Sequence, residues 1–335
     1  MSSSPVLTAE RIKVHFPLRA DWPWQHAPVL RAVDGASLQL SAGHTLGLVG
    51  ESGCGKSTLA RALTGLAPIT SGRLCLDDRD ITAGTTRDWR RLRQDVQMIF
   101  QDPLASLDPR MTVGQIIAEP LRHLQRQLSK AERRQRVADM IDRVGLSQSQ
   151  LNRYPHEFSG GQCQRIGIAR ALVVRPRVLI CDEPVSALDV SIQARIVELL
   201  MELQRETNVA MLFIAHDLAV VRQISHDVRV MYLGHLMEQA ASDRLFDTPR
   251  HPYTKALLSA VPRPDLAVER ARQRIRLPGD LPSPANPPSG CVFRTRCPWA
   301  QPDCSERVPE PRDVDGSWVA CHYAESIGER VAEPV

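Results

Sequence analysis

The sequence predicts an α/β fold with a largely parallel sheet, and three observations along the chain indicate it. Short apolar runs typical of buried strands occur at Thr45–Gly50, Arg177–Cys181 and Val209–Ala215. Two of these runs are followed by apolar residues at helical spacing, in Lys56–Leu66 and Ser191–Thr207. Strands that alternate with helices in this way usually form a sheet that helices cover on both faces.

Length and composition limit the possible classes of protein. The 335 residues are 43% hydrophobic, which is enough for one large α/β domain with a smaller appendage. The longest apolar run is far shorter than the roughly 20 residues that cross a bilayer, and Met1–Glu10 lacks a secretory pattern. The net charge is only +4, with both signs interspersed, which does not favour nucleic-acid binding. We therefore expect a cytosolic chain with no transmembrane segment of its own, which reaches a membrane only through partners.

A glycine-rich loop lies between the first buried strand and the helix after it. Its sequence, GESGCGKST, fits the phosphate-binding pattern G-x-x-x-x-G-K-[ST] at each fixed position. The glycines let backbone N–H groups turn around phosphates, Lys56 reaches the outer phosphates, and the Ser57 hydroxyl ligates Mg²⁺. Only four of the 42 basic residues are lysine, so this lysine is a functional candidate. We expect ATP and Mg²⁺ to bind here through Gly50, Ser52, Gly53, Cys54, Gly55, Lys56, Ser57 and Thr58.

Two carboxylates end the second buried strand. The segment Val178–Glu183 reads VLICDE, so the apolar run delivers Asp182 and Glu183 to its carboxyl end. In proteins with this kind of phosphate loop such an aspartate holds Mg²⁺, which is the role we predict for Asp182. The adjacent Glu183 points to the other side and can polarise the attacking water as a general base.

A third motif decides the subclass. Phe158–Gln162 reads FSGGQ, shortly before the carboxylate strand, and resembles the LSGGQ signature of the ABC transporter ATPases. The order of motifs over the first 250 residues is similar to that family, and the apolar Phe158 in place of leucine implies no loss of function. The resemblance implies a RecA-like P-loop NTPase core with an antiparallel β subdomain and a helical subdomain at about 102–165.

The same resemblance implies roles for further residues. Gln101 in IFQDP is similar to the glutamine that senses Mg²⁺ and the membrane partner, Ser186–Asp189 to the dimer-contact loop, and His216 to the switch histidine. On its own, His216 would be a hydrogen-bonded histidine at a strand end. In the family two domains face head to tail, so the signature residues complete the partner's ATP site. The implied catalytic residues are Lys56, Gln101, Glu183 and His216, and the signature residues that bind ATP are Ser159, Gly160, Gly161 and Gln162.

The aromatic residue that stacks on adenine in this family lies upstream of the phosphate loop. Phe16 in KVHFP is our first choice and His15 the second. The stretch Pro17–Pro28 is rich in proline and tryptophan and resembles an inserted loop.

The C-terminal part distinguishes among ABC proteins. The segments RHPYTKALL at Arg250–Leu258 and GDLPSP at Gly279–Pro284, followed by four cysteines, resemble the extension of dipeptide and oligopeptide importer ATPases. The likeness covers nearly the whole chain and is strongest to the second ATPase subunit of bacterial dipeptide importers. We expect an ATPase domain at 1–250 and the extension at 251–335. Alternatives are an importer ATPase for nickel or haem, or a soluble ABC ATPase.

The resemblance also implies partners and a location. These are a paralogous ATPase subunit in a heterodimer, two membrane permease subunits and, indirectly, a periplasmic solute-binding protein. The chain would lie peripherally on the cytoplasmic face of the bacterial inner membrane.

Four cysteines in the extension have five, six and sixteen residues between them: Cys291, Cys297, Cys304 and Cys321. Four thiolates suit either tetrahedral zinc or an iron–sulfur cluster, but the short C-x₂₋₄-C pairs usual for structural zinc are missing. The resemblance implies a [4Fe-4S] cluster, with zinc as the alternative and His322 as a possible ligand. Its role would be structural, because a proline-rich tail has little core of its own. The other cysteines, Cys54, Cys75, Cys163 and Cys181, we interpret as small buried residues or fillers within motifs.

Overall fold

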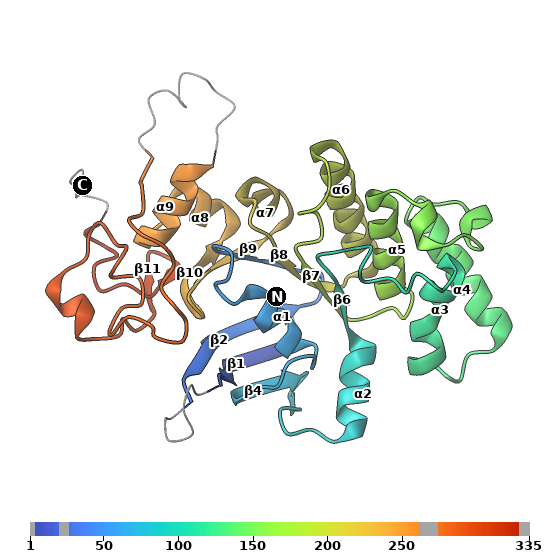
Figure 1. Cartoon of the computed structure of the whole chain (residues 1–335), viewed down its shortest axis with the longest axis horizontal. Helices are drawn as coiled ribbons and strands as arrows, with labels where there is room; N and C mark the ends of the chain where they lie inside the picture. Colours follow the sequence, from blue (N-terminus) through green and yellow to red (C-terminus); the bar gives the residue numbers. More distant parts are fainter. Residues whose placement is uncertain (1–3, 20–26, 262–273, 328–335) are drawn as a thin grey trace.

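The computed structural model describes residues 4–19, 27–261 and 274–327. Its centre is an eight-stranded sheet with the order β11-β12-β10-β9-β3-β8-β7-β6 (Figure 1). The five strands from β9 to β6 run parallel to one another, whereas β10, β12 and β11 at the other edge pair antiparallel, beginning with β10 against β9. The strands are β3 Thr45–Val49, β6 Val96–Ile99, β7 Val178–Asp182, β8 Ala210–Ile214, β9 Asp227–Tyr232, β10 His235–Ala241, β11 Arg312–Val314 and β12 Ser317–Val319.

A second, antiparallel sheet packs against one side of this core. Its order is β2-β1-β4-β5. Strand β2 shows buried and exposed residues in near alternation, as expected for a sheet with one face on the core, whereas β1 buries residues 6–9 in an unbroken run. Helix α1 adds its apolar residues to the same cluster as both sheets. The elements are β1 Pro5–Pro17, β2 Val29–Ser41, β4 Ser71–Leu76, β5 Arg79–Asp80 and α1 Lys56–Leu63.

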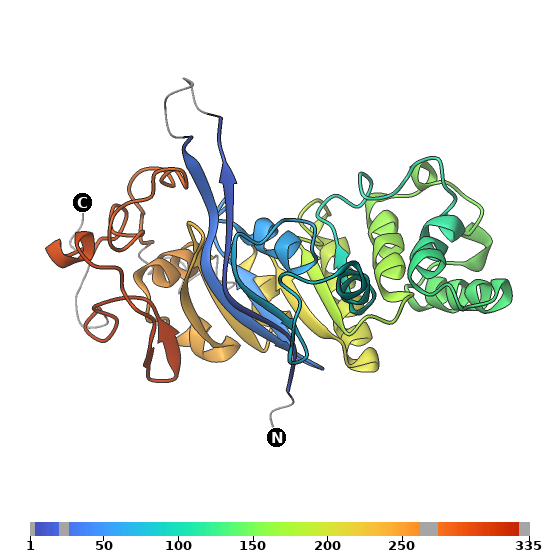
Figure 2. The same cartoon turned by 90° about the horizontal axis from the view of Figure 1, so that it is seen from below.

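A helical part lies at one end of the molecule, opposite the C-terminal extension (Figures 1 and 2). The charge-dense segment 122–144, predicted to form amphipathic helices, is divided between two of them. The division is local in origin, because the Ser129 hydroxyl and the Glu132 carboxylate cap the start of the second helix reciprocally. The helices of this part are α3 Val113–Leu124, α4 Lys130–Arg143, η1 Gln148–Gln150, η2 Pro155–Glu157 and α5 Gly160–Leu172. Helix α2, Thr86–Asp95, lies beside β6 instead and places Leu92 in the core that the two sheets share (Figure 1).

The C-terminal extension is built onto the eight-stranded sheet. Strand β12 pairs with β10 through Glu238↔Val319 and Gln239↔Trp318. The ring of Phe293 packs against Tyr232 of β9 and Tyr253, with ring centroids 5.2 and 5.3 Å apart. The extension therefore shares its core with the parallel sheet. The remaining helices are α6 Val190–Thr207, α7 Leu218–Ile224, α8 Ser242–Asp247, α9 Pro252–Ala260 and η3 Pro302–Ser305.

The predicted α/β class, with its parallel sheet, antiparallel subdomain and helical part, is confirmed. Each predicted buried strand is found within one residue or so of its expected bounds, as β3, β7 and β8. The domain boundary at 250 falls in the connection between α8 and α9 and stays a prediction. In the part of the chain that the structure describes, no helix combines the length and apolar character needed to span a membrane.

Candidate functional site

The glycine-rich loop connects β3 to α1, and two of its glycines are required by close backbone contacts. A Cβ atom on Gly50 would lie 2.1 Å from the Met231 carbonyl oxygen, and one on Gly55 would lie 2.1 Å from that of Ala32. Gly55 also has a φ of 108°, which side chains rarely adopt. The loop can therefore pass this close to β2 and β9 only with glycine at both positions.

The side chain of Lys56 is bound inside this loop. It is only 4% exposed, and its Nζ donates hydrogen bonds to the carbonyl oxygens of Gly50 at 2.8 Å and Glu51 at 2.9 Å. Carbonyl groups are dipoles and carry no net charge, so they orient the ammonium group without neutralising it. Its positive charge remains available to an anion that enters the loop.

Two side-chain oxygen atoms, from Ser57 and Asp182, meet at the start of α1. The Ser57 hydroxyl donates to Asp182 Oδ1 at 2.9 Å, across the gap between α1 and the end of β7. Burial raises the pKa of the Asp182 carboxyl, and the hydrogen bond from Ser57 opposes that shift. Within the described residues, no three or more His, Cys, Asp or Glu side chains are arranged to hold a metal ion. A Mg²⁺ ion at Ser57 and Asp182 would complete its shell with phosphate oxygens and water, as this ion usually does.

Glu183 follows Asp182 and has a φ of 48°, which is uncommon for a residue with a side chain. Its Oε2 accepts a hydrogen bond from Gln101 Nε2 at 2.9 Å and lies 3.7 Å from His216 Nδ1. The Ser186 hydroxyl donates to the Glu183 carbonyl at 3.0 Å, which helps to hold this backbone conformation. These side chains line an open cleft of about 620 Å³, whose lining is Ser52, Gln101, Asp102, Glu183, Ser186, Ala187 and His216.

The signature residues lie apart from this cleft. Ser159 caps α5, and its backbone N–H donates to Gln162 Oε1 at 3.0 Å. Ser159 and Gly160 are exposed, whereas Gly161 is buried so tightly that a Cβ atom would lie 2.6 Å from Ile192. The cleft therefore brings together the phosphate loop, Gln101, Glu183 and His216, but not the signature of the same chain.

The predicted adenine-stacking residues also lie outside the cleft. Phe16 is on β1, pairs with Leu30 and packs partly buried against the core. His15 Nε2 lies 3.4 Å from Asp34 Oδ1. Residues 20–26 of the predicted inserted loop lie outside the described residues.

The four tail cysteines are close enough to act on one another. Burial raises the pKa of Cys297 to about 12 and that of Cys321 to about 11, and charge repulsion from the other tail thiols adds to both shifts. The backbone N–H of Cys291 donates to the Cys304 carbonyl at 2.8 Å. A single zinc ion would need its sulfur ligands about 3.8 Å apart, from Zn–S bonds of about 2.3 Å in a tetrahedron. In the part of the chain that the structure describes, no three or more His, Cys, Asp or Glu side chains are arranged to hold a metal ion, so the geometry of these thiols favours neither zinc nor the cluster.

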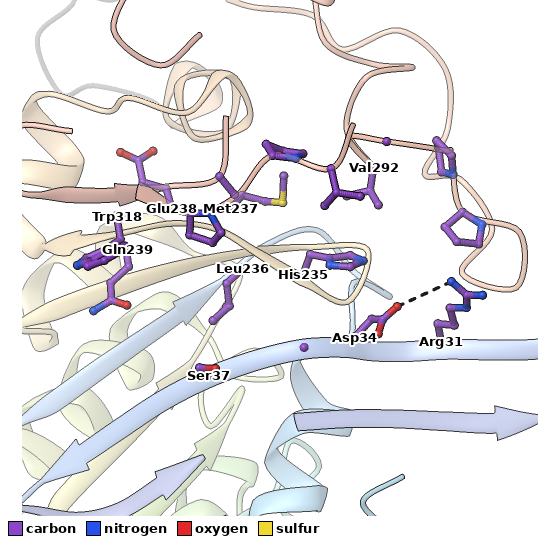
Figure 3. A pocket seen from close by; sticks show the side chains of 18 of the residues that line it. Arg31, Asp34, Ser37, His235, Leu236, Met237, Glu238, Gln239, Val292 and Trp318 are labelled. Carbon is purple, nitrogen blue, oxygen red and sulfur yellow. Dashed lines mark ion pairs between the residues drawn. The ribbon is translucent and has the colours of Figure 1, made fainter. Parts of the chain in front are cut away.

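A second cavity, of about 630 Å³, lies between β2, β10 and the extension (Figure 3). Its rim on β2 carries an ion pair between Arg31 and Asp34 at 3.9 Å. Prolines and apolar side chains of the extension form much of the opposite wall, so the cavity lies where the extension meets β2 and β10. None of the predicted phosphate-binding residues lines this cavity.

Sequence reasoning missed two contacts that the tail makes with the phosphate loop. The Tyr253 hydroxyl accepts a hydrogen bond from the backbone N–H of Glu51 at 2.8 Å, and Arg296 Nη1 lies 2.8 Å from Glu51 Oε2. Tyr253 lies in the segment Arg250–Leu258, which carries the family resemblance, and Arg296 lies between Cys291 and Cys297. Nothing in their spacing connects them to residue 51, because the contact is made by the docking of the extension.

Comparisons with known proteins show which family the chain belongs to. A family model described as "ABC transporter" matches residues 33–186, and one described as "Oligopeptide/dipeptide transporter, C-terminal region" matches 237–304. The oligopeptide transport ATP-binding protein OppF of Salmonella typhimurium is 58% identical over 89% of this chain and 90% of its own. The di/tripeptide transport ATP-binding protein DppF of Pseudomonas aeruginosa is 49% identical over 96% and 98%.

Solved structures show the same fold. One is cbiO1 from Clostridium perfringens, part of the ABC transporter complex cbiONQ, with a TM-score of 0.63 and 27% identity over 73% of this chain and 92% of that one. Another is a dimeric post-hydrolysis state of the ATP-binding cassette MJ0796 with ADP and Pi, with a TM-score of 0.63 and 25% identity over 70% and 98%. The predicted cassette architecture is confirmed.

The position of Lys56 leads to a first prediction. Lys56→Ala should weaken the binding of a fluorescent ATP analogue by at least about tenfold, because the loop loses its charge-assisted contact with the phosphates. Lys130→Ala, at an exposed lysine on α4, is the matched control and should bind normally. A thermal melt without nucleotide shows whether the loop still folds. Unchanged affinity in a folded Lys56→Ala protein would contradict a phosphate-binding role.

Proposed function

Since this chain belongs to the ABC transporter ATPases, and within them to the oligopeptide and dipeptide transporter group, we propose that it hydrolyses ATP to power peptide import across a membrane. The observation that carries the proposal is the grouping of Gln101, Glu183 and His216 beside an intact phosphate loop. The solute is a peptide in this proposal, in preference to nickel or haem, because several relatives over most of the chain are named for peptide transport.

Each residue predicted for the ATP site has a part in binding or hydrolysing ATP. Lys56 and the loop backbone hold the phosphates, and Ser57 with Asp182 holds Mg²⁺, which would neutralise charge that develops on the transferred phosphoryl group. Glu183 accepts the proton of the attacking water. Gln101 and His216 both lie against the Glu183 carboxylate, so they orient the base and the water beside it. Phe16 is our candidate for adenine stacking.

We propose that the complete ATP site needs two chains. Ser159 and Gly160 are exposed at the start of α5, where the helix dipole favours an anion. Since the signature does not line this chain's own cleft, it is placed to complete the site of a second ATPase subunit. The partner in our proposal is a paralogue, so that the pair forms a heterodimer with Ser186–Asp189 at its contact.

The proposal places this pair on the cytoplasmic face of a bacterial inner membrane, bound to two permease subunits and served by a periplasmic solute-binding protein. The support is the similarity to transport ATP-binding proteins. An apolar side chain near Gln101 fits a contact with a permease, since Leu104 is 55% exposed.

We further propose that Cys291, Cys297, Cys304 and Cys321 bind a [4Fe-4S] cluster. The support is that these thiols lie close enough to influence one another and that four cysteine thiolates are the usual ligands of such a cluster. The extension has a small apolar cluster of its own, formed by Val314, Val319 and Ala324, so a bound cluster would stabilise it. Cluster binding must displace the thiol protons.

Glu183→Gln tests the transport function in membrane vesicles that contain the chain with its permeases. The variant should bind ATP normally, hydrolyse it at least about 100-fold more slowly, and import no labelled peptide, because the base is lost while the phosphate site is kept. Glu198→Gln, at an exposed carboxylate on α6, serves as the control. Normal turnover in Glu183→Gln would remove Glu183 from this role, and failure to recover the chain with membrane subunits would contradict the importer assignment.

Metal analysis after anaerobic purification tests the cysteine site. We expect about four irons and about four acid-labile sulfides per chain. Cys297→Ser should lower both values, whereas Cys75→Ser, at a buried cysteine on β4, should not. Stoichiometric zinc without iron would overturn the proposed cluster.

A further inference from the structure

All three polar groups of Glu51, the second residue of the phosphate loop, have partners, and two of them connect the loop to the C-terminal extension. Its carbonyl oxygen accepts from Lys56 Nζ at 2.9 Å. Its backbone N–H donates to the Tyr253 hydroxyl at 2.8 Å. Its carboxylate forms an ion pair with Arg296 at 2.8 Å. One loop residue is therefore held by the phosphate-binding lysine on one side and by the extension on the other.

The two extension residues are held firmly in place. Tyr253 is fully buried and packs against Tyr232 and Phe293. The Arg296 side chain is only 10% exposed; its Nε donates to the Pro278 carbonyl at 3.3 Å, and its guanidinium lies over the Tyr232 ring. Because these contacts fix the guanidinium fork, the pair with Glu51 is stronger than a surface ion pair.

The charge of Glu51 makes this contact relevant to ATP. A carboxylate in a phosphate-binding loop repels the phosphates, and the repulsion is weakly screened where the carboxylate is partly buried. Arg296 removes that net charge. Leu281 of the extension also lies near the loop, because a Cβ atom built on Gly53 would be 3.9 Å from its side chain.

We propose that Arg296 is a positioning residue of the ATP site, which neutralises and fixes Glu51 so that the phosphate loop accepts ATP fully only when the extension is docked. The inference rests on the proposed ATPase function and goes beyond it, because it assigns the extension a part in nucleotide binding. By linkage, bound ATP stabilises the docked extension to the same degree.

Nucleotide affinity of full-length variants tests this inference. Arg296→Gln should weaken the binding of a fluorescent Mg-ATP analogue about tenfold, which corresponds to about 1.4 kcal/mol. The double variant Glu51→Gln, Arg296→Gln should recover most of that loss, because the unpaired carboxylate is gone. Arg294→Gln is the matched control: this arginine is two residues away and bonds to Ser289 instead of the loop.

The outcomes separate charge pairing from a merely structural role. Wild-type affinity in Arg296→Gln overturns the proposal. So does a double variant that binds as weakly as Arg296→Gln, because the loss would then come from a distorted extension. Lys56→Ala, measured in the same assay, separates the proposed ATPase function from this inference. If Lys56→Ala loses ATP binding and Arg296→Gln does not, the ATPase function stands and this inference fails.

Tyr253→Phe offers an independent variant that removes a single oxygen and leaves the aromatic packing. We expect a loss of about threefold in nucleotide affinity, because the Glu51 N–H then lacks its acceptor and the loop is less well held. Unchanged affinity would show that the hydrogen bond from Glu51 to Tyr253 plays no part in positioning the loop.

Discussion

The structure depends on one constraint, which is that a lysine must be kept charged inside a tight backbone loop. Lys56 meets it by donating to the carbonyl groups of Gly50 and Glu51, which orient the ammonium group without neutralising it. The loop can take this shape only because Gly50 and Gly55 leave room for neighbouring backbone. The rest of the site is arranged around this charge: Ser57 and Asp182 at the start of α1, and Glu183 at the end of β7.

The parallel sheet explains why residues far apart in the sequence meet here. Strands β3, β7 and β8 are neighbours, and the phosphate loop, Glu183 and His216 follow their carboxyl ends. The antiparallel edge beyond β9 connects the sheet to the extension. It continues into β10 and the extension's β12, so the extension becomes part of the sheet and comes within reach of Glu51.

Much of the fold and of the cleft was predictable, because it is encoded in local patterns. Apolar runs predicted β3, β7 and β8, and the loop and strand-end motifs named Lys56, Asp182 and Glu183. The contacts of Tyr253 and Arg296 with Glu51 were not predictable, since they join segments about 200 residues or more apart through the packing of aromatic side chains. The group that the tail cysteines bind was not predictable from their spacing either, because the spacing is compatible with both zinc and an iron–sulfur cluster.

A structure of the full chain with a Mg-bound, non-hydrolysable ATP analogue is the most direct test of this account. We expect Lys56 Nζ to leave the Gly50 and Glu51 carbonyl groups for a phosphate oxygen, with Ser57 and Asp182 beside the metal and the pair between Glu51 and Arg296 intact. Nucleotide bound elsewhere, or a phosphate loop that binds ATP only after its contact with Arg296 has broken, would contradict the account.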